Sequence, residues 1–301
     1  MKKYLIPALM LTYLLVITAC EHNPRYSLQS PDGSLQVTFS LTETGEARYA
    51  VSRNQVTVLH NSELGIVLND RDLSSDLQLV SAGKPTLVHD EYTLRHGKRR
   101  HNTYTAMEQV FHLQNGNGQK LDIAFRISND GIAFRYSLPG QSSEIKTVEA
   151  ETTSFAFTEN TRAWLQPVAV AQTGWMNTNP SYEEHYRRDV PVNELPASEA
   201  GWAFPALFKT EGGWVLISEA GMDGRYHASR LQGEAHAGEF RIGYPTDAER
   251  YTDGALMARS QLPFRSPWRI IAVGGLDTIA ASTLGTDLAQ PAIAPMEWVR
   301  P

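Results

Sequence analysis

The sequence contains a single cysteine, Cys20, in 301 residues. Because the rest of the chain has none, disulfide bonds contribute nothing to its stability, even in an oxidising compartment. Stability must therefore come from a hydrophobic core, and a chain of this length is long enough to bury one. The fold is expected to rest on packing of apolar side chains and not on covalent cross-links.

The chain also lacks an excess of positive charge. Its formal net charge is −6, and acidic and basic residues are interspersed along the sequence. A nucleic-acid partner would require a basic patch, so this class of partner is excluded. The most basic run, residues 98–101, is short, and we expect a solvated loop or a strand end there.

Several common catalytic patterns are missing as well. The nine histidines are scattered, without the clustering with cysteine or carboxylate that binds zinc. No helix is expected after Gly116 and Gly118, so these glycines indicate a hairpin and not a phosphate loop. No Gly-x-Ser-x-Gly segment is present, which leaves a serine hydrolase without support.

The first twenty residues predict export. Lys2-Lys3 gives a basic start, and the apolar stretch over residues 5–18 is too short to span a bilayer comfortably. It ends in Ile17-Thr18-Ala19-Cys20, which resembles a bacterial lipobox. We therefore expect a signal peptide over residues 1–19 and a lipid on Cys20 that anchors the protein in the bacterial cell envelope, in the periplasm or at the outer membrane. An ordinary signal peptide with an incidental cysteine is the alternative.

The mature region has the pattern of β-strands. Residues 20–29 are polar and contain proline, as expected of a linker. From Ser30 onward, apolar and polar residues alternate with period two. Turn signals separate the alternating stretches, among them the hairpin sequence Asn115-Gly116-Asn117-Gly118. Strands are expected at residues 35–41, 47–53, 64–68, 109–113, 121–127 and 132–136.

No long helical period interrupts these strands. Only residues 277–288 are expected to be helical, with their apolar residues on one face. The combination predicts an all-β sandwich or barrel that forms one domain over residues 30–290, with short helical segments near the C-terminus. Residues 291–301 are expected to be a linker and the first residues of a further domain.

Aromatic residues and carboxylates alternate with short apolar strands between Trp164 and Gly275. Aromatic rings suit the C–H faces of sugars, and carboxylates bind hydroxyl groups or hard cations, so the mixture indicates carbohydrate. We expect Trp175, Tyr182 and Tyr186 to border a substrate pocket. The other tryptophans of this region lie in or beside apolar strands and are expected to pack in the core or against another domain: Trp164, Trp202, Trp214 and Trp268.

The order of several segments matches a known family. They are Ser30-Pro31-Asp32-Gly33-Ser34-Leu35, Gly97-Lys98-Arg99-Arg100, Asn129-Asp130-Gly131-Ile132-Ala133-Phe134-Arg135-Tyr136, Phe204-Pro205-Ala206-Leu207-Phe208, Ile217-Ser218-Glu219-Ala220 and Ser266-Pro267-Trp268-Arg269. Together they make the chain resemble the N-terminal domain of glycoside hydrolase family 97 over essentially its whole mature length. The resemblance implies a large antiparallel β-sandwich, a super-sandwich, that precedes a catalytic (β/α)8 barrel. Trp298-Val299-Arg300-Pro301 looks like the start of that barrel, so the barrel is expected to be a missing partner.

The resemblance also implies a calcium ion at the active site, to which the sandwich contributes the carboxylate of Glu183. The adjacent Glu184 leaves this assignment open by one residue, and a solvated loop balanced by Arg187 and Arg188 is the alternative. Calcium takes about six to eight oxygen ligands, so one carboxylate binds it weakly in the isolated chain. Glu219 is expected either to accept hydrogen bonds from loop amides or to contact substrate. The expected substrate-binding residues are Trp175, Tyr182, Glu184, Tyr186 and Glu219.

Arg269 is expected to pair with a carboxylate across the sheet, which is a structural role. A glycosidase needs two carboxyl groups at a defined separation, and in this family the barrel supplies them, so no catalytic residue is expected here. The chain is interpreted as the active-site-completing domain of an α-glucosidase or α-galactosidase, inactive alone, whose ligand is an α-linked oligosaccharide. The alternatives are a stand-alone carbohydrate-binding envelope lipoprotein and, more weakly, a purely structural one.

Overall fold

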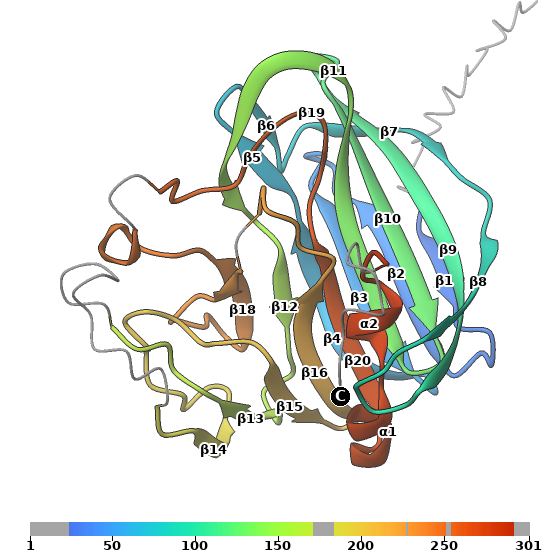
Figure 1. The fold of residues 1–301 in the computed structure, drawn as a ribbon, viewed down its shortest axis with the longest axis vertical. Coiled ribbons are helices and arrows are strands. Elements are labelled where there is room, and N and C mark those ends of the chain that lie inside the picture. Colours follow the sequence, from blue (N-terminus) through green and yellow to red (C-terminus); the bar gives the residue numbers. More distant parts are fainter. Residues whose placement is uncertain (1–23, 171–183, 227, 251–253, 292–301) are drawn as a thin grey trace, which may run out of the picture.

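Three antiparallel sheets form the fold in a computed structural model that describes residues 24–170, 184–226, 228–250 and 254–291 (Figure 1). The first sheet has four strands in the order β1-β2-β3-β4. The second has 13 strands, most of which follow the path β14-β13-β15-β16-β20-β11-β10-β9-β7. The third has the order β12-β18-β17.

The strands of each sheet have the following bounds. The four-stranded sheet contains β1 (Tyr26–Gln29), β2 (Leu35–Leu41), β3 (Ala47–Arg53) and β4 (Val56–Leu64). The 13-stranded sheet contains β14 (Arg187–Pro191), β13 (Arg162–Leu165), β15 (Ala206–Thr210), β16 (Gly213–Ala220), β20 (Trp268–Gly274), β11 (Gly131–Glu151), β10 (Lys120–Ser128), β9 (His101–Asn115) and β7 (Leu77–Ala82), with β5 (Ile66–Leu68), β6 (Arg71–Leu73), β8 (Thr86–Thr93) and β19 (Arg259–Arg265) paired beside this path. The small sheet contains β12 (Ser154–Ala156), β18 (Glu239–Gly243) and β17 (Arg230–Leu231).

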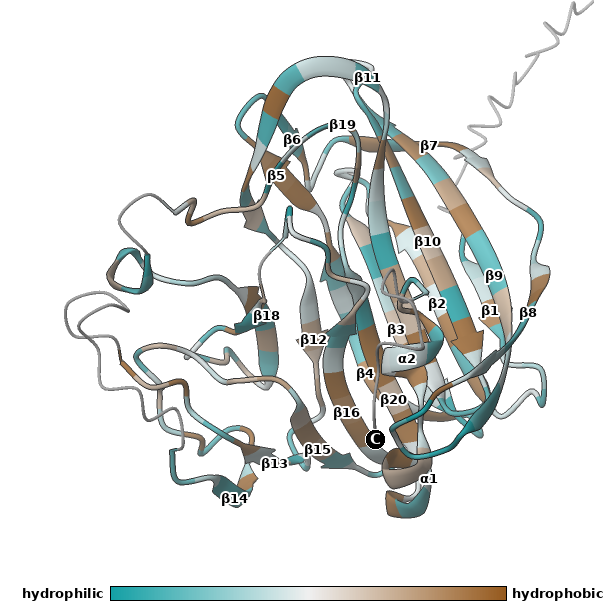
Figure 2. Cartoon of the chain, viewed as in Figure 1, coloured by the Kyte–Doolittle hydropathy of each residue, from teal (hydrophilic) through white to brown (hydrophobic). Residues whose placement is uncertain are grey.

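The expected all-β fold is confirmed. β2 and β3 have the predicted bounds, and buried side chains alternate with partly exposed ones along both. Figure 2 shows the same alternation of hydrophobic and hydrophilic residues along β9 and β10. The strand expected at residues 64–68 is divided at Gly65, between the end of β4 and the start of β5. A side chain at Gly65 would meet the Cα of Ser74 at 2.7 Å, so only glycine fits there. β1 lies within residues 20–29, which were expected to be a linker, so the first sheet begins in that segment.

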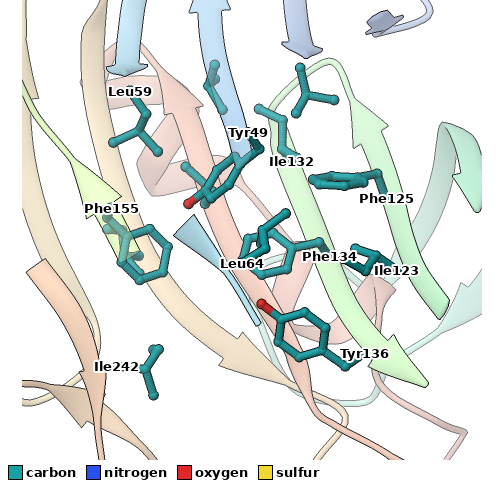
Figure 3. Close-up of a cluster of buried hydrophobic side chains, with 14 of the residues drawn as sticks. Tyr49, Leu59, Leu64, Ile123, Phe125, Ile132, Phe134, Tyr136, Phe155 and Ile242 are labelled. Carbon is teal, nitrogen blue, oxygen red and sulfur yellow. The ribbon is translucent and has the colours of Figure 1, made fainter. Parts of the chain in front are cut away.

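The main core lies between the four-stranded sheet and one face of the 13-stranded sheet. Phe39 of β2 stacks on Phe111 of β9 with ring centroids 4.1 Å apart. Figure 3 shows the neighbouring part of this core, where Phe125 and Phe134 lie side by side with centroids 5.6 Å apart. The buried hydroxyl of Tyr136 accepts a hydrogen bond from the Gly65 amide at 2.9 Å, which satisfies a polar group inside the core.

The opposite face of the 13-stranded sheet, which we call the outer face, carries a second apolar cluster under two short helices. These helices are α1 (Leu276–Ala281) and α2 (Leu284–Asp287), which pack against β16 and β20 (Figure 1). Their residues Ile279 and Leu284 share this cluster with Trp268 of β20. A 3₁₀ turn, η1 (Asp247–Glu249), completes the helical elements of the described ranges, none of which is long and apolar enough to cross a membrane.

A break at Ser282 and Thr283 divides the segment that was expected to be a single helix. Serine and threonine side chains compete for backbone hydrogen bonds and weaken a helix interior. Lys98 Nζ donates a hydrogen bond to the Ser282 carbonyl at 2.7 Å, and Arg99 Nη2 donates one to Thr283 Oγ1 at 2.6 Å. The basic run at residues 98–101 is thus an exposed loop that runs into β9, as expected, but two of its side chains also hold the helical segment on the sheet.

Candidate functional site

One end of the 13-stranded sheet gathers several of the segments in which site residues are expected. Arg187, at the start of β14, pairs with Leu165, at the end of β13. The same row of residues continues through β15 to Ile217 of β16, two residues before Glu219. Glu219 and residues 184–186 therefore lie beyond this row, on the same side of it. Three strand spacings separate β14 from β16, so these two groups of residues are about 14 Å apart. We call this end of the sheet the loop end.

Two predicted substrate-binding residues are exposed at the loop end. Glu184 and Tyr186 lie in the segment that leads into β14, and Tyr186 is 51% exposed. An exposed aromatic ring close to an exposed carboxylate can contact a ligand from solvent. The other predicted residues, Trp175, Tyr182 and Glu183, lie outside the described residues, as does Cys20.

Glu219 is held within the protein, with its side chain only 7% exposed. Its Oε1 accepts a hydrogen bond from the Ser229 amide at 3.0 Å. Its Oε2 accepts hydrogen bonds from Ser229 Oγ and from Arg269 Nη1, each at 2.5 Å. The expected hydrogen bond from a loop amide is therefore present, and both carboxylate oxygens are engaged. The predicted contact of Glu219 with substrate stays a prediction.

Arg269 pairs with carboxylates across the sheet, as expected. Glu219 is its direct cross-strand partner. In addition, Nε and Nη2 of Arg269 donate to the two carboxylate oxygens of Glu151 at 2.9 and 2.5 Å, which is a bidentate pair between two fully buried side chains. Burial lowers the pKa of Arg269, but the negative charge of Glu151 raises this pKa by more. The pKa of Arg269 therefore lies well above its usual range.

Glu151 and two tyrosines extend this buried cluster and were not predicted from the sequence. The Tyr244 hydroxyl donates to Glu151 Oε2 at 2.9 Å and lies 2.9 Å from the Tyr226 hydroxyl. Burial raises the pKa of both tyrosines, and the negative charge of Glu151 raises it further. We call the set the Arg269 network: Glu151, Glu219, Tyr226, Ser229, Tyr244 and Arg269.

The Arg269 network anchors the loops at this end of the sheet. Ser229 lies between β16 and β17, and the next residue, Arg230, forms a buried ion pair with Glu249 at 2.6 Å. Arg230 Nη1 also donates to the carbonyl of Ala200 at 2.8 Å. These contacts join loops that are distant in sequence at the same end of the sheet as the exposed Glu184 and Tyr186.

The tryptophans of this region pack as expected. Trp202 and Trp268 are buried, with 1% and 2% of their surfaces exposed. Trp164 lies against Trp214 with ring centroids 4.8 Å apart. Among the three aromatic residues predicted to border a pocket, the structure describes Tyr186, whose side chain is exposed.

The described residues do not complete a metal site. No group of three or more His, Cys, Asp or Glu side chains in this part of the chain is arranged to hold an ion. Both oxygens of Glu219 are engaged, whereas the exposed Glu184 offers one carboxylate. Because calcium takes about six to eight oxygens, further ligands would have to come from elsewhere.

Nearly all of the described chain matches a known protein family. A family model described as Glycosyl-hydrolase 97 N-terminal matches residues 28–291. The chain belongs to this family. The expected resemblance is therefore confirmed, and the sandwich described above is the fold of a glycosyl-hydrolase 97 N-terminal domain.

Three relatives show how much of a longer protein this family 97 domain represents. A probable retaining alpha-galactosidase from Streptomyces bingchenggensis (strain BCW-1) is 34% identical over 264 residues, which are 86% of this chain and 37% of that protein. The crystal structure of a beta-arabinopyranosidase superposes with a TM-score of 0.80 and 36% identity, over 86% of this chain and 42% of that one. A family 97 enzyme from Pseudoalteromonas sp. strain K8, in complex with panose, has a TM-score of 0.76 at 23% identity, over 92% of this chain and 40% of that one, and this likeness shows the fold alone. The chain thus spans less than half the length of each.

Proposed function

We propose that this chain is the N-terminal domain of a glycosidase of the α-galactosidase or α-glucosidase type, and that it completes the active site of a catalytic (β/α)8 barrel. The loop end carries the proposal, because Glu184 and Tyr186 are exposed there, at the same end of the sheet as the buried Arg269 network. An aromatic ring and a carboxylate are the groups that contact the C–H face and the hydroxyls of a sugar. The ligand is an α-linked oligosaccharide, and the barrel supplies the catalytic acid and its carboxylate partner.

The relatives support this class of substrate. One is named a probable retaining alpha-galactosidase and another a beta-arabinopyranosidase. Family 97 enzymes from Pseudoalteromonas have been crystallised with panose and with acarbose. All of these names concern sugars, which favours an oligosaccharide over other classes of ligand.

The proposal includes a calcium ion shared between the sandwich and the barrel. Glu183 would contribute one carboxylate oxygen, with Glu184 as the alternative ligand. Carboxylates from both domains around one ion would join the domains and fix the loop end against the barrel. When bound, calcium would polarise a substrate oxygen as a Lewis acid.

Hydrolysis assays test this function. The 301-residue chain alone is expected to release no nitrophenol from nitrophenyl α-galactoside or nitrophenyl α-glucoside. A chimaera in which this chain replaces the matching domain of the Streptomyces enzyme is expected to hydrolyse at least one of these substrates, because the chain then completes the active site of the barrel. Hydrolysis by the chain alone would contradict the proposal, and so would a folded but inactive chimaera that still binds the sugar, which would instead favour a stand-alone binding module.

We also propose that Cys20 carries a lipid that anchors the domain at the cell envelope. The support is a sole cysteine directly after Ile17-Thr18-Ala19, behind a basic and apolar leader. Cys20→Ser is expected to leave an exported protein that is no longer associated with membranes. Metabolic labelling with a radioactive fatty acid checks this: the unchanged protein should be labelled and Cys20→Ser should not, and an unlabelled parent protein would refute the anchor.

A further inference from the structure

Three arginines lie close together on the outer face of the 13-stranded sheet. We call Arg126 of β10, Arg135 of β11 and Arg265 of β19 the arginine cluster. Arg135 pairs with Ala124, two residues before Arg126, while Arg265 pairs with Ser137, two residues after Arg135. Arg126 and Arg265 are therefore diagonal neighbours of Arg135, at about 7–8 Å between Cα atoms, which long side chains can bridge.

The arginine cluster has little negative charge to balance it. Arg126 Nε donates to Glu108 Oε2 at 2.6 Å. In the described part of the chain, neither Arg135 nor Arg265 forms an ion pair with a carboxylate. Asp122, which pairs with Ser137 on the same face, lies 2.7 Å from His112 Nδ1 through its Oδ1. Three arginines thus face two carboxylates, and neither carboxylate pairs with Arg135 or Arg265, although the chain as a whole has a formal charge of −6. Such a local reversal of charge indicates a surface that attracts anions.

Arg135 is the least satisfied member. Its Nε is buried without any hydrogen-bond partner in the structure. Its guanidinium carbon lies 4.3 Å from the centre of the Trp268 ring, and that of Arg126 lies 5.0 Å from the same centre. These cation–π contacts stabilise the charges but leave the Nε donor of Arg135 without an acceptor.

The electrostatics of Arg135 point the same way. Burial lowers its pKa, and the charges of Arg265 and Arg126 lower it further, to about 10. At neutral pH the guanidinium therefore remains charged, although it is poorly solvated and repelled by its neighbours. An unpaired cation in such surroundings costs free energy, which a bound anion would recover.

We propose that Arg135 and Arg265 bind an oxyanion group, a carboxylate or a sulfate, on the outer face beside Trp268. Arg265 is exposed and Arg135 is partly exposed, so a small ligand can reach both guanidinium groups from solvent. Planar guanidinium groups bind such oxyanions with paired hydrogen bonds. The oxyanion is either a free inorganic ion or the acidic group of a sugar such as a uronate. The site does not depend on the proposed glycosidase function.

Calorimetric titration of the whole chain tests this site with sodium sulfate, sodium glucuronate and, as the uncharged reference, glucose. Saturable binding of sulfate or glucuronate is expected, with no binding of glucose at this site. Arg135→Gln and Arg265→Gln are each expected to weaken it by about tenfold, because each removes a charge-assisted hydrogen bond. Arg250→Gln, which removes the same charge from an exposed arginine near η1, is the matched control and should change nothing.

The outcomes separate the two sources of the oxyanion. Binding of sulfate alone identifies a free inorganic ion as the ligand, and preferential binding of glucuronate identifies an acidic sugar. Binding of neither, or equal binding by the parent protein and both variants, overturns the proposal. Circular dichroism confirms that the variants are folded, and the exposed Arg265 keeps the test decisive if Arg135→Gln does not fold.

Discussion

Replacement of Arg269 by methionine is expected to lower the free energy of unfolding by about 3–5 kcal/mol, since it leaves buried carboxylates without their counter-charge. Arg269 donates to both oxygens of Glu151 and to one oxygen of Glu219, and its own side chain is fully buried. Methionine has a similar length, so the loss reports mainly on charge and hydrogen bonding. Urea unfolding measures the change as a lower midpoint at an unchanged slope.

Arg250→Met is the control for this loss. Arg250 is 51% exposed and lies 3.5 Å from Asp247, so its removal should cost less than about 1 kcal/mol. Adding Glu219→Gln to Arg269→Met should restore part of the lost stability, because one of the uncompensated charges is then neutral. Equal losses in Arg269→Met and Arg250→Met would show that the Arg269 network does not stabilise the fold.

The strands could be predicted because their signal is local. Alternation of apolar and polar residues fixes which side chains face the core, and turn residues fix where each strand stops. β2 and β3 were therefore predicted with their observed bounds. The serine and threonine at the break in the C-terminal helix are a local signal. The contacts that hold this segment on the sheet could not be predicted, because Lys98 and Arg99 lie 184 residues away from Ser282 and Thr283 respectively.

In the candidate site, too, some features could be predicted from the sequence and others depend on contacts between distant residues. Arg269 was expected to pair with a carboxylate across the sheet, and Glu219 was expected either to accept hydrogen bonds from loop amides or to contact substrate. Glu151 gave no such signal, because it lies 118 residues from Arg269 and only the return of β11 toward the third sheet brings it near (Figure 1). Sequence patterns thus identified residues that need partners, whereas the topology supplied the partners.

Within the chimaera described above, Glu183→Gln is expected to weaken calcium binding and to lower kcat by at least about tenfold, a loss that outer-shell changes at metal sites already produce. Glutamine keeps the shape and one neutral oxygen, so the loss reports on the charge of a calcium ligand. Calorimetric titration with calcium and the initial rate of nitrophenol release measure the two effects. Glu211→Gln is the matched control, because the exposed Glu211 lies in the turn between β15 and β16, at the opposite end of the sheet from the loop end.

The pattern of loss distinguishes a ligand from a structural carboxylate. Substitution of a calcium ligand should weaken calcium binding without lowering the free energy of unfolding. Glu219→Gln should instead lower the free energy of unfolding first, because Glu219 accepts hydrogen bonds from Arg269 and Ser229. In the isolated chain Glu183→Gln should be nearly silent, since a lone carboxylate binds calcium weakly. If Glu184→Gln instead of Glu183→Gln abolishes calcium binding in the chimaera, the ligand is Glu184, and if neither does, the sandwich contributes no carboxylate to the ion.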